Sequence, residues 1–222
     1  MDPLIFRDRK QAGELLARKL TKYAKREDVV VLAIPRGGVP VGFEVARALH
    51  LPLDVFIVRK LGVPWQEELA FGAVATGGIR VLDEQIVESL HLTPEQIESV
   101  TERENKELER RERVYRGKRP PLAVKGKAVL LVDDGIATGS SMLAGITALR
   151  QLEPAQIVVA TPVAPPTTCA RLRKKADDLV CVTMPVSFFA IGQFYENFLP
   201  TSDAEVCALV EEASAAIARS AV

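Results

Sequence analysis

The chain has 222 residues, of which 48% are hydrophobic and 26% charged, and 29 Lys and Arg balance 29 Asp and Glu to give a formal net charge of zero. This composition is typical of a globular protein with a sizeable core. A neutral chain gives no electrostatic case for non-specific nucleic-acid binding, so we expect no nucleic-acid partner.

Residues 1–8 contain no apolar run of signal-peptide length, and no segment approaches the roughly 18 apolar residues that a membrane helix needs. We therefore expect a soluble, cytoplasmic protein without membrane contact. Cys169, Cys181 and Cys207 are scattered and only two histidines could join them. Reduced thiols are thus expected, and neither a zinc site nor a disulfide framework.

Hydrophobic periodicity and glycine content predict the elements of the first 80 residues. In order, they are an amphipathic helix over 8–25, a buried strand over Val29–Ile34, a helix over Val41–Leu49, a second buried strand over Leu53–Val58, and a glycine-rich loop with irregular strand over 62–80, in which Phe71–Ala75 is the best strand candidate.

Thr93-Pro94-Glu95-Gln96 predicts a helix start, with Thr93 as cap, proline at the first position and Gln96 closing a capping box. The helix continues to about Tyr115 and is highly charged. We interpret it as a solvated surface helix in preference to an arm that binds a partner.

The second half of the chain alternates strands and helices. The predicted elements are a strand over Val129–Val132, a helix over 140–152, a strand over Ile157–Thr161, a helix over 167–175, a strand over Leu179–Thr183, an aromatic-rich irregular segment over Met184–Leu199, and a helix to about Arg219 that starts at the capping box Ser202–Glu205.

Unbroken apolar strands alternating with helices predict one α/β domain over residues 1–222, with a doubly wound, mainly parallel, five-stranded sheet. Ligands of such sheets bind beyond the carboxyl ends of the strands. Three segments fall there: Arg36–Gly38 after the first strand, Arg59-Lys60 after the second, and Asp133–Ser141 after the third.

Asp133 and Asp134 are adjacent acids at the end of a buried strand, where they repel each other and lose hydration. A helix cap plus a surface acid is the structural alternative. Carboxylates accept hydrogen bonds from hydroxyls and coordinate Mg²⁺, which favours a functional pair. The loop from Ala137 to Ser141 then leads into a helix, whose N-terminal N–H groups, with the hydroxyls of that loop, form a phosphate cradle. A phosphorylated ribose would fit both features.

The segment Val129–Ser141 closely resembles the ribose-phosphate signature of the type I phosphoribosyltransferases. The resemblance implies that Asp133 and Asp134 bind the ribose hydroxyls of phosphoribosyl pyrophosphate (PRPP). It implies the following 5′-phosphate site: Ala137, Thr138, Gly139, Ser140 and Ser141. Gly135 departs from the family pattern, which usually has an apolar residue there.

Two further segments resemble the family's pyrophosphate site. Arg36, Gly37 and Gly38 match its pyrophosphate loop, because glycines expose N–H groups and the arginine adds a charged fork. Arg59 and Lys60 become counter-ions of pyrophosphate under this interpretation, although a solvated strand end is the ordinary alternative. Residues 62–78, with Trp65, then match the flexible loop that closes over the active site.

The resemblance covers a core of about 28–183. It implies a hood subdomain from 184–199 and the terminal helices, and a helical insertion over 93–119. The implied acceptor pocket contains Ile136, Phe188, Phe189, Phe194 and Tyr195. Core packing is the alternative for each aromatic residue. The segment Phe189–Glu196 and the charged insertion resemble a bacterial branch of the family whose acceptor is not established.

The family resemblance implies a transferase of nucleotide metabolism that moves ribose 5-phosphate from PRPP to a nitrogen of a nucleobase or related amine. Mg²⁺ would be held mainly through PRPP, with Asp133 and Asp134 as candidate ligands, and the family habit is a homodimer. Ala137 stands where family members that act on 6-oxopurines usually carry an acid, so hypoxanthine and guanine are disfavoured acceptors.

Two alternatives stay open at this point. The same site could sense PRPP without catalysis, although a regulator would usually bring a DNA-binding helix-turn-helix or a basic face. The acid pair could also serve a phospho-acceptor or phosphatase, but acids should then end the first strand, where Pro35 and Arg36 stand.

Overall fold

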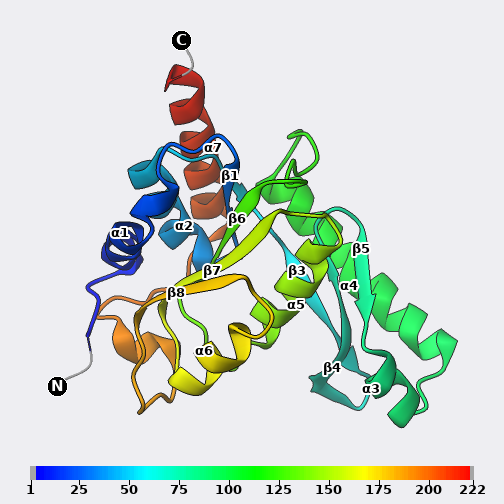
Figure 1. Ribbon diagram of the computed structural model, residues 1–222. Coiled ribbons are helices and arrows are strands. Elements are labelled where there is room, and N and C mark those ends of the chain that lie inside the picture. Colours follow the sequence, from blue (N-terminus) through cyan, green and yellow to red (C-terminus); the bar gives the residue numbers. More distant parts are fainter. Residues whose placement is uncertain (1–3, 221–222) are drawn as a thin grey trace.

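Five parallel strands form the central sheet of the computed structural model, which describes residues 4–220 (Figure 1). Their order across the sheet is β2-β1-β6-β7-β8. The strands are β1 (Val29–Ala33), β2 (Leu53–Val55), β6 (Ala128–Val132), β7 (Gln156–Val163) and β8 (Asp178–Thr183). The predicted doubly wound, five-stranded parallel sheet is thus confirmed.

Helices cover both faces of this sheet, so that successive residues of each central strand enter different cores. Val29, Val31 and Ala33 of β1 pack into the cluster that includes α1 (Arg9–Lys19), α2 (Gly38–Leu49) and α7 (Asp203–Ser220). Val30 and Leu32 pack into the cluster with α5 (Ser140–Arg150) and α6 (Pro166–Leu172). Burial on both faces explains why the strands are unbroken apolar runs.

The second predicted strand, Leu53–Val58, is corrected by the structure, because the chain changes sheets within it. β2 ends at Val55, and β3 (Val58–Val63) begins an antiparallel sheet with β4 (Gln66–Ala75) and β5 (Ile79–Leu82). The N–H of Phe56 still bonds to Ala33 of the central sheet, at 2.9 Å. The N–H of Ile57 already bonds to the Thr76 hydroxyl, at 2.9 Å. Both residues are buried, so the apolar run hides the change of sheet.

The antiparallel sheet also contains most of the segment expected as a glycine-rich loop, 62–78. Val63 pairs with Gln66, so that Pro64 and Trp65 form the turn between β3 and β4. The best strand candidate, Phe71–Ala75, is therefore the second half of a longer strand. The tip of this hairpin is polar and exposed, and it lacks the alternation that marks a half-buried strand.

Two helices lie beside this sheet on the right of Figure 1: α3 (Glu84–Ser89), which the sequence did not predict, and α4 (Pro94–Tyr115). The capping box of α4 is present, since Thr93 and Gln96 exchange hydrogen bonds of 2.9 and 3.3 Å. α4 is only partly a solvated surface helix, because it buries Val100, Leu108 and Tyr115 against the core.

A third, smaller cluster joins the N-terminal segment to the segment that follows β8. Phe6 donates its N–H to the Phe194 carbonyl at 2.8 Å, and its own carbonyl accepts the Glu196 N–H at 2.8 Å. Phe6, Ala12 and Val163 pack there with Phe194 and Tyr195. The short 3-10 helix η2 (Ile191–Phe194) lies in this region, and a second one, η1 (Thr21–Tyr23), follows α1.

The remaining predicted elements agree with the structure within a few residues, apart from the first helix, which ends at Lys19. Cys169 is buried, Cys181 and Cys207 are half-buried, and all three are free thiols. Among residues 4–220, no helix is long and apolar enough to cross a membrane. Residues 1–3, part of the segment inspected for a signal peptide, lie outside the described residues.

Candidate functional site

The candidate site lies where β1 and β6 end side by side at the middle of the central sheet. After β1 the chain enters α2 on one face, and after β6 it enters α5 on the other. A crevice opens between such connections, which is the usual ligand position in a doubly wound sheet. The N–H of Ile34 bonds to the Val132 carbonyl at 2.9 Å and holds the two loops together.

Asp133 and Asp134 follow β6 directly at its carboxyl end, as predicted. Asp134 is buried, with 7% of its surface exposed, and Asp133 is half-buried. The N–H of Asp134 donates to Asp133 Oδ1 at 2.9 Å. Desolvation raises the pKa of Asp133 well above its ordinary 3.8, and the charge of Asp134 raises it further. Desolvation also raises the pKa of Asp134, although the Arg9 guanidinium opposes this effect.

The loop after β1 closes directly over the acid pair, and its glycines make that approach possible. A Cβ atom on Gly37 would overlap Oδ2 of Asp134. A Cβ atom on Gly38 would lie 2.8 Å from the carbonyl oxygen of Val132. Any side chain here would therefore push the two loops apart.

Arg36, on the same loop, is exposed and turned toward the start of α7. Its Nη1 lies 3.6 Å from Oδ1 of Asp203, the first residue of that helix. Asp203 also accepts the hydroxyl of Tyr115 from α4, at 2.6 Å. Burial and this hydrogen bond raise the pKa of Tyr115 to about 12, while Tyr115 and nearby arginines lower the pKa of Asp203.

Arg59 and Lys60 lie within β3 of the antiparallel sheet and not at the end of a central strand, which corrects their predicted position. The guanidinium of Arg59 pairs with Glu104 of α4, with 2.6 Å between Nη2 and Oε2. The structure thus gives Arg59 a structural partner in addition to its predicted role at pyrophosphate.

The predicted phosphate loop runs into α5, whose first turn contains no acidic residue and no side-chain cap. Gly139 precedes the helix with φ of 75°, a conformation that favours glycine. Thr138 and Ser140 are exposed, with 3.2 Å between their hydroxyl oxygens. The N-terminal N–H groups of α5 are therefore free of a competing carboxylate and suit an anion.

α6 supports this loop from behind, through residues that sequence reasoning missed. Thr168 donates its hydroxyl to the Ala137 carbonyl at 2.7 Å, and Arg171 donates to the Thr138 carbonyl. Neither residue belongs to a motif or lies near the loop in sequence. No signal in a single sequence could have identified them.

The aromatic residues expected at the acceptor pocket divide between core and surface. Phe194 and Tyr195 are buried in the small cluster, and the ring of Phe188 packs on Phe194 at 5.1 Å between centroids. Ile136 is buried as well, whereas Phe189 is 89% exposed. Core packing therefore describes Phe194, Tyr195 and Ile136, and their buried side chains offer no open face to an acceptor.

Gly135, which departs from the family pattern, packs against the segment 184–199. A Cβ atom on Gly135 would overlap Cγ2 of Ile191, the first residue of η2. The hydroxyl of Tyr195 also donates to the Asp134 carbonyl at 2.5 Å. The irregular segment 184–199 therefore packs directly onto the loop that contains the acid pair.

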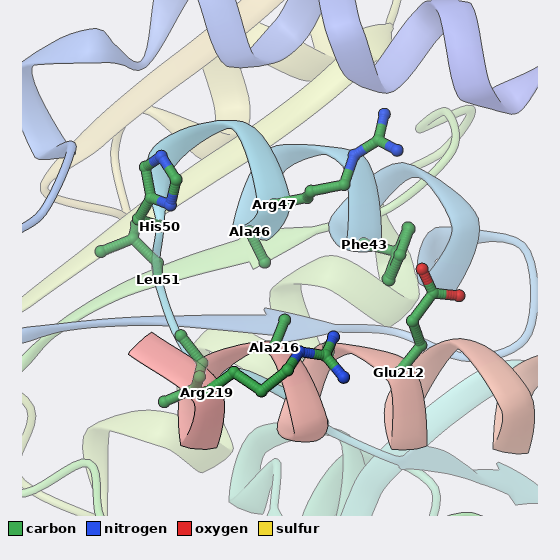
Figure 2. Close-up of a pocket in the computed structure, with 10 residues that line it drawn as sticks. Phe43, Ala46, Arg47, His50, Leu51, Glu212, Ala216 and Arg219 are labelled. Carbon is green, nitrogen blue, oxygen red and sulfur yellow. The ribbon is translucent and has the colours of Figure 1, made fainter. Parts of the chain in front are cut away.

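A separate pocket of about 310 Å³ lies between α2 and α7 and is not lined by the acid pair (Figure 2). Phe43 and Ala46 of α2 face Ala216 of α7, and Arg47 and Glu212 stand at the rim. None of the predicted site residues lines this pocket, and we assign it no role.

The described part of the chain contains no cluster of three or more His, Cys, Asp or Glu side chains that could hold a metal ion. Any divalent cation at the acid pair would need most of its ligands from a bound molecule. Two carboxylates remain a suitable partial donor set, because Mg²⁺ prefers oxygen and keeps several non-protein ligands.

The chain is similar in sequence and in structure to known proteins. Residues 6–197 match the phosphoribosyl transferase domain family. Proteins of two Mycobacterium tuberculosis strains, CDC 1551 and H37Rv, both named "Putative phosphoribosyl transferase", are 44% identical over 209 residues, which cover 94% of this chain and 47% of theirs. The crystal structure of TT1426 from Thermus thermophilus is similar with a TM-score of 0.85 and 42% identity, covering 94% of this chain and 99% of that one.

The contact between Gly135 and Ile191 predicts that the cost of a side chain at residue 135 depends on the size of residue 191. Gly135→Ala should lower the free energy of unfolding by about 1–3 kcal/mol, because the added methyl group meets a packed neighbour. The same change in an Ile191→Ala background should cost less, since the overlapping atom is gone. Denaturant unfolding of the four proteins measures both costs, and equal costs in the two backgrounds would contradict the contact.

The raised pKa of Asp133 predicts a cost in stability that depends on pH. A carboxyl whose folded pKa lies above its unfolded value stabilises the fold while protonated, and this contribution is lost as pH rises from about 4 through the folded pKa. Asp133→Asn should therefore raise stability at pH 7 by about 0.5–2 kcal/mol, and by less near pH 4. Thermal unfolding in metal-free buffer at the two pH values checks this, and a variant less stable than wild type at pH 7 would refute it.

Proposed function

Because the chain belongs to the phosphoribosyl transferase family, we propose that it transfers the ribose 5-phosphate of PRPP to a nitrogen of a nucleobase or related amine and releases pyrophosphate. One observation carries the proposal. The loop from Asp133 to Ser141 presents two carboxylates at one end and a helix N-terminus without a side-chain cap at the other, beyond the carboxyl end of β6.

This arrangement suits the two ends of a ribose phosphate. The N–H groups of Ser140 and Ser141, with the nearby hydroxyls, would bind the 5′-phosphate. Asp133 and Asp134 would accept hydrogen bonds from the ribose hydroxyls. The backbone of Gly37 and Gly38 lies close to the same acids, and the N–H of Gly38 donates to the Ile34 carbonyl at 3.1 Å. Arg36, with the N–H of Gly37, would bind the pyrophosphate.

In the proposed reaction, the acceptor nitrogen forms a bond to C1 of the ribose. The bond from C1 to the pyrophosphate oxygen breaks, and the leaving group keeps the electron pair. Cleavage of the C–O bond runs ahead of formation of the C–N bond, so the ring is cationic in between, and the acceptor nitrogen releases its N–H proton to water as the new bond forms. The protein contributes by fixing the ribose and both phosphate ends in line, and by placing the carboxylates beside the developing charge.

Mg²⁺ fits this site as a partner of PRPP. It would be held mainly by pyrophosphate and ribose oxygens, with Asp133 and Asp134 as the protein's candidate ligands. A bound Mg²⁺ neutralises charge on the leaving pyrophosphate.

Arg36 would exchange partners when PRPP binds. Its exposed ion pair with Asp203 is long, at 3.6 Å, and such pairs contribute little stability. A pyrophosphate group offers a stronger, charge-assisted partner.

The β3–β4 hairpin, with Trp65 exposed at its turn, is our candidate for the loop that closes over the bound substrate. Arg59 and Lys60 on β3 would approach pyrophosphate as the hairpin closes.

The chain spans about half the length of the Mycobacterium tuberculosis relatives, so the proposal concerns the activity of this domain. Homodimer formation remains a prediction, and light scattering of the purified protein measures it. Cytoplasmic location and nucleotide metabolism likewise remain predictions that follow from the proposed reaction.

A carboxylate placed at the phosphate position tests the binding mode. Ser141→Asp should weaken PRPP binding at least about 10-fold by charge repulsion, yet leave folding intact, because an acid in the first helical turn is favourable. Isothermal titration calorimetry measures the dissociation constant, and Ser99→Asp on α4 makes the same charge change away from the loop. Unchanged affinity in Ser141→Asp would contradict the assignment of the phosphate site.

The nature of the acceptor is tested by pyrophosphate release with PRPP, Mg²⁺ and a panel of bases. Because Ala137 cannot accept a proton, we expect adenine, orotate or another amine to give faster release than hypoxanthine or guanine. Rapid turnover of hypoxanthine would overturn the acceptor prediction. PRPP binding without pyrophosphate release from any base would favour a sensor over an enzyme.

A further inference from the structure

Arg9 of α1 forms a buried ion pair with the acid pair of the site. Its Nε lies 2.7 Å from Oδ2 of Asp134, and the two side chains are only 13% and 9% exposed. The guanidinium also donates to the Leu199 carbonyl at 2.8 Å and stacks over the Phe198 ring at 4.0 Å. A carboxylate, a carbonyl and an aromatic ring thus fix one guanidinium from three sides.

Such a pair is not explained by stability alone. Removing two charges from water costs about as much as their attraction returns, so apolar residues of similar size could hold the same segments together. Phe6, Phe194 and Tyr195 already pack there without charge. The pair is therefore better explained by what it does to Asp134.

Arg9 fixes the position of one of the two adjacent carboxylates. Its Nε donates to Oδ2 of Asp134. This buried, charge-assisted hydrogen bond restrains the Asp134 side chain, so this carboxylate is oriented before a ligand binds.

We propose that Arg9 is a positioning residue for PRPP: it holds the Asp134 carboxylate in the orientation that the ribose hydroxyls need, and it connects that carboxylate to the 184–199 segment through Phe198 and Leu199. The inference rests on the proposed function, because it assigns Arg9 to the ribose subsite of that reaction. Arg9 acts through Asp134 and does not itself contact the substrate.

The alternative is that Arg9 only fastens the N-terminal helix to the 184–199 segment. The two roles differ in a double-mutant cycle. If Arg9 acts through Asp134, its loss has no further effect on PRPP affinity once Asp134 is neutral. If Arg9 acts on packing alone, the two losses add.

The experiment measures the dissociation constant of PRPP with Mg²⁺ by calorimetry for the full chain and its variants. Arg9→Met should weaken binding about 10- to 100-fold, the usual worth of a charged hydrogen bond, and Arg9→Lys should lie between Arg9→Met and wild type. Asp134→Asn should also weaken binding, and Arg9→Met/Asp134→Asn should match Asp134→Asn alone. Arg18→Met, which removes an exposed charge from the same helix, is the control and should match wild type.

Wild-type affinity in Arg9→Met, or additive losses in the double variant, would overturn the role of Arg9. Thermal unfolding confirms that each variant is folded, and Arg9→Gln, which keeps a donor without the charge, replaces Arg9→Met if that variant unfolds. Failure of the proposed function has a different signature, because wild-type protein itself would then give no PRPP binding. Binding by wild type with unaffected Arg9 variants removes only this inference.

Discussion

Two carboxylates held side by side and largely out of water, at the carboxyl end of β6, constrain everything around them. Their charges repel and their burial raises the pKa of both. The backbone after β1 comes close to the two carboxylates, which is possible because Gly37 and Gly38 have no side chains. Arg9 provides a cation that forms an ion pair with Asp134. A fold would not maintain this costly arrangement for stability alone, which is why we propose the acid pair as part of the ligand-binding site.

Segments far apart in the chain complete this one site. The acid pair follows a strand from the middle of the sequence, while Arg9 comes from the first helix and Tyr195 from the segment after the last strand of the central sheet. Tyr195 and Arg9 contact the same residue, Asp134, through its backbone and its side chain. The Phe6 hydrogen bonds join the N-terminal segment to the 184–199 segment, so both segments that contact Asp134 are also bonded to each other.

Much of the fold could be predicted from the sequence because buried parallel strands and capped helices leave local signals. The run Val129–Val132 and the capping box at Thr93 are such signals, and both are confirmed. The change of sheet after Val55 could not be predicted, because Phe56 and Ile57 remain buried and apolar across it. α3 was missed because it buries no residue and therefore has no apolar periodicity.

In the candidate site, too, some features have local sequence signals and others do not. Its loops follow strands directly and were recognised, whereas its supporting residues depend on tertiary contacts. Arg9 is a cation on an amphipathic helix, which the sequence pattern cannot distinguish from a solvated surface residue. Gly135 was recognised as unusual, but its reason, the close approach of Ile191, exists only in three dimensions.

The phosphoribosyl transferase family supplies the reaction class, and the geometry of residues 133–141 supplies the binding mode we propose for it. A crystal structure of the protein with PRPP and Mg²⁺ tests that binding mode most directly. We expect the 5′-phosphate on the N–H groups of residues 139–141, with the ribose hydroxyls within hydrogen-bond distance of Asp133 and Asp134. PRPP found elsewhere, for example in the pocket between α2 and α7, with the acid pair left unengaged, would contradict it.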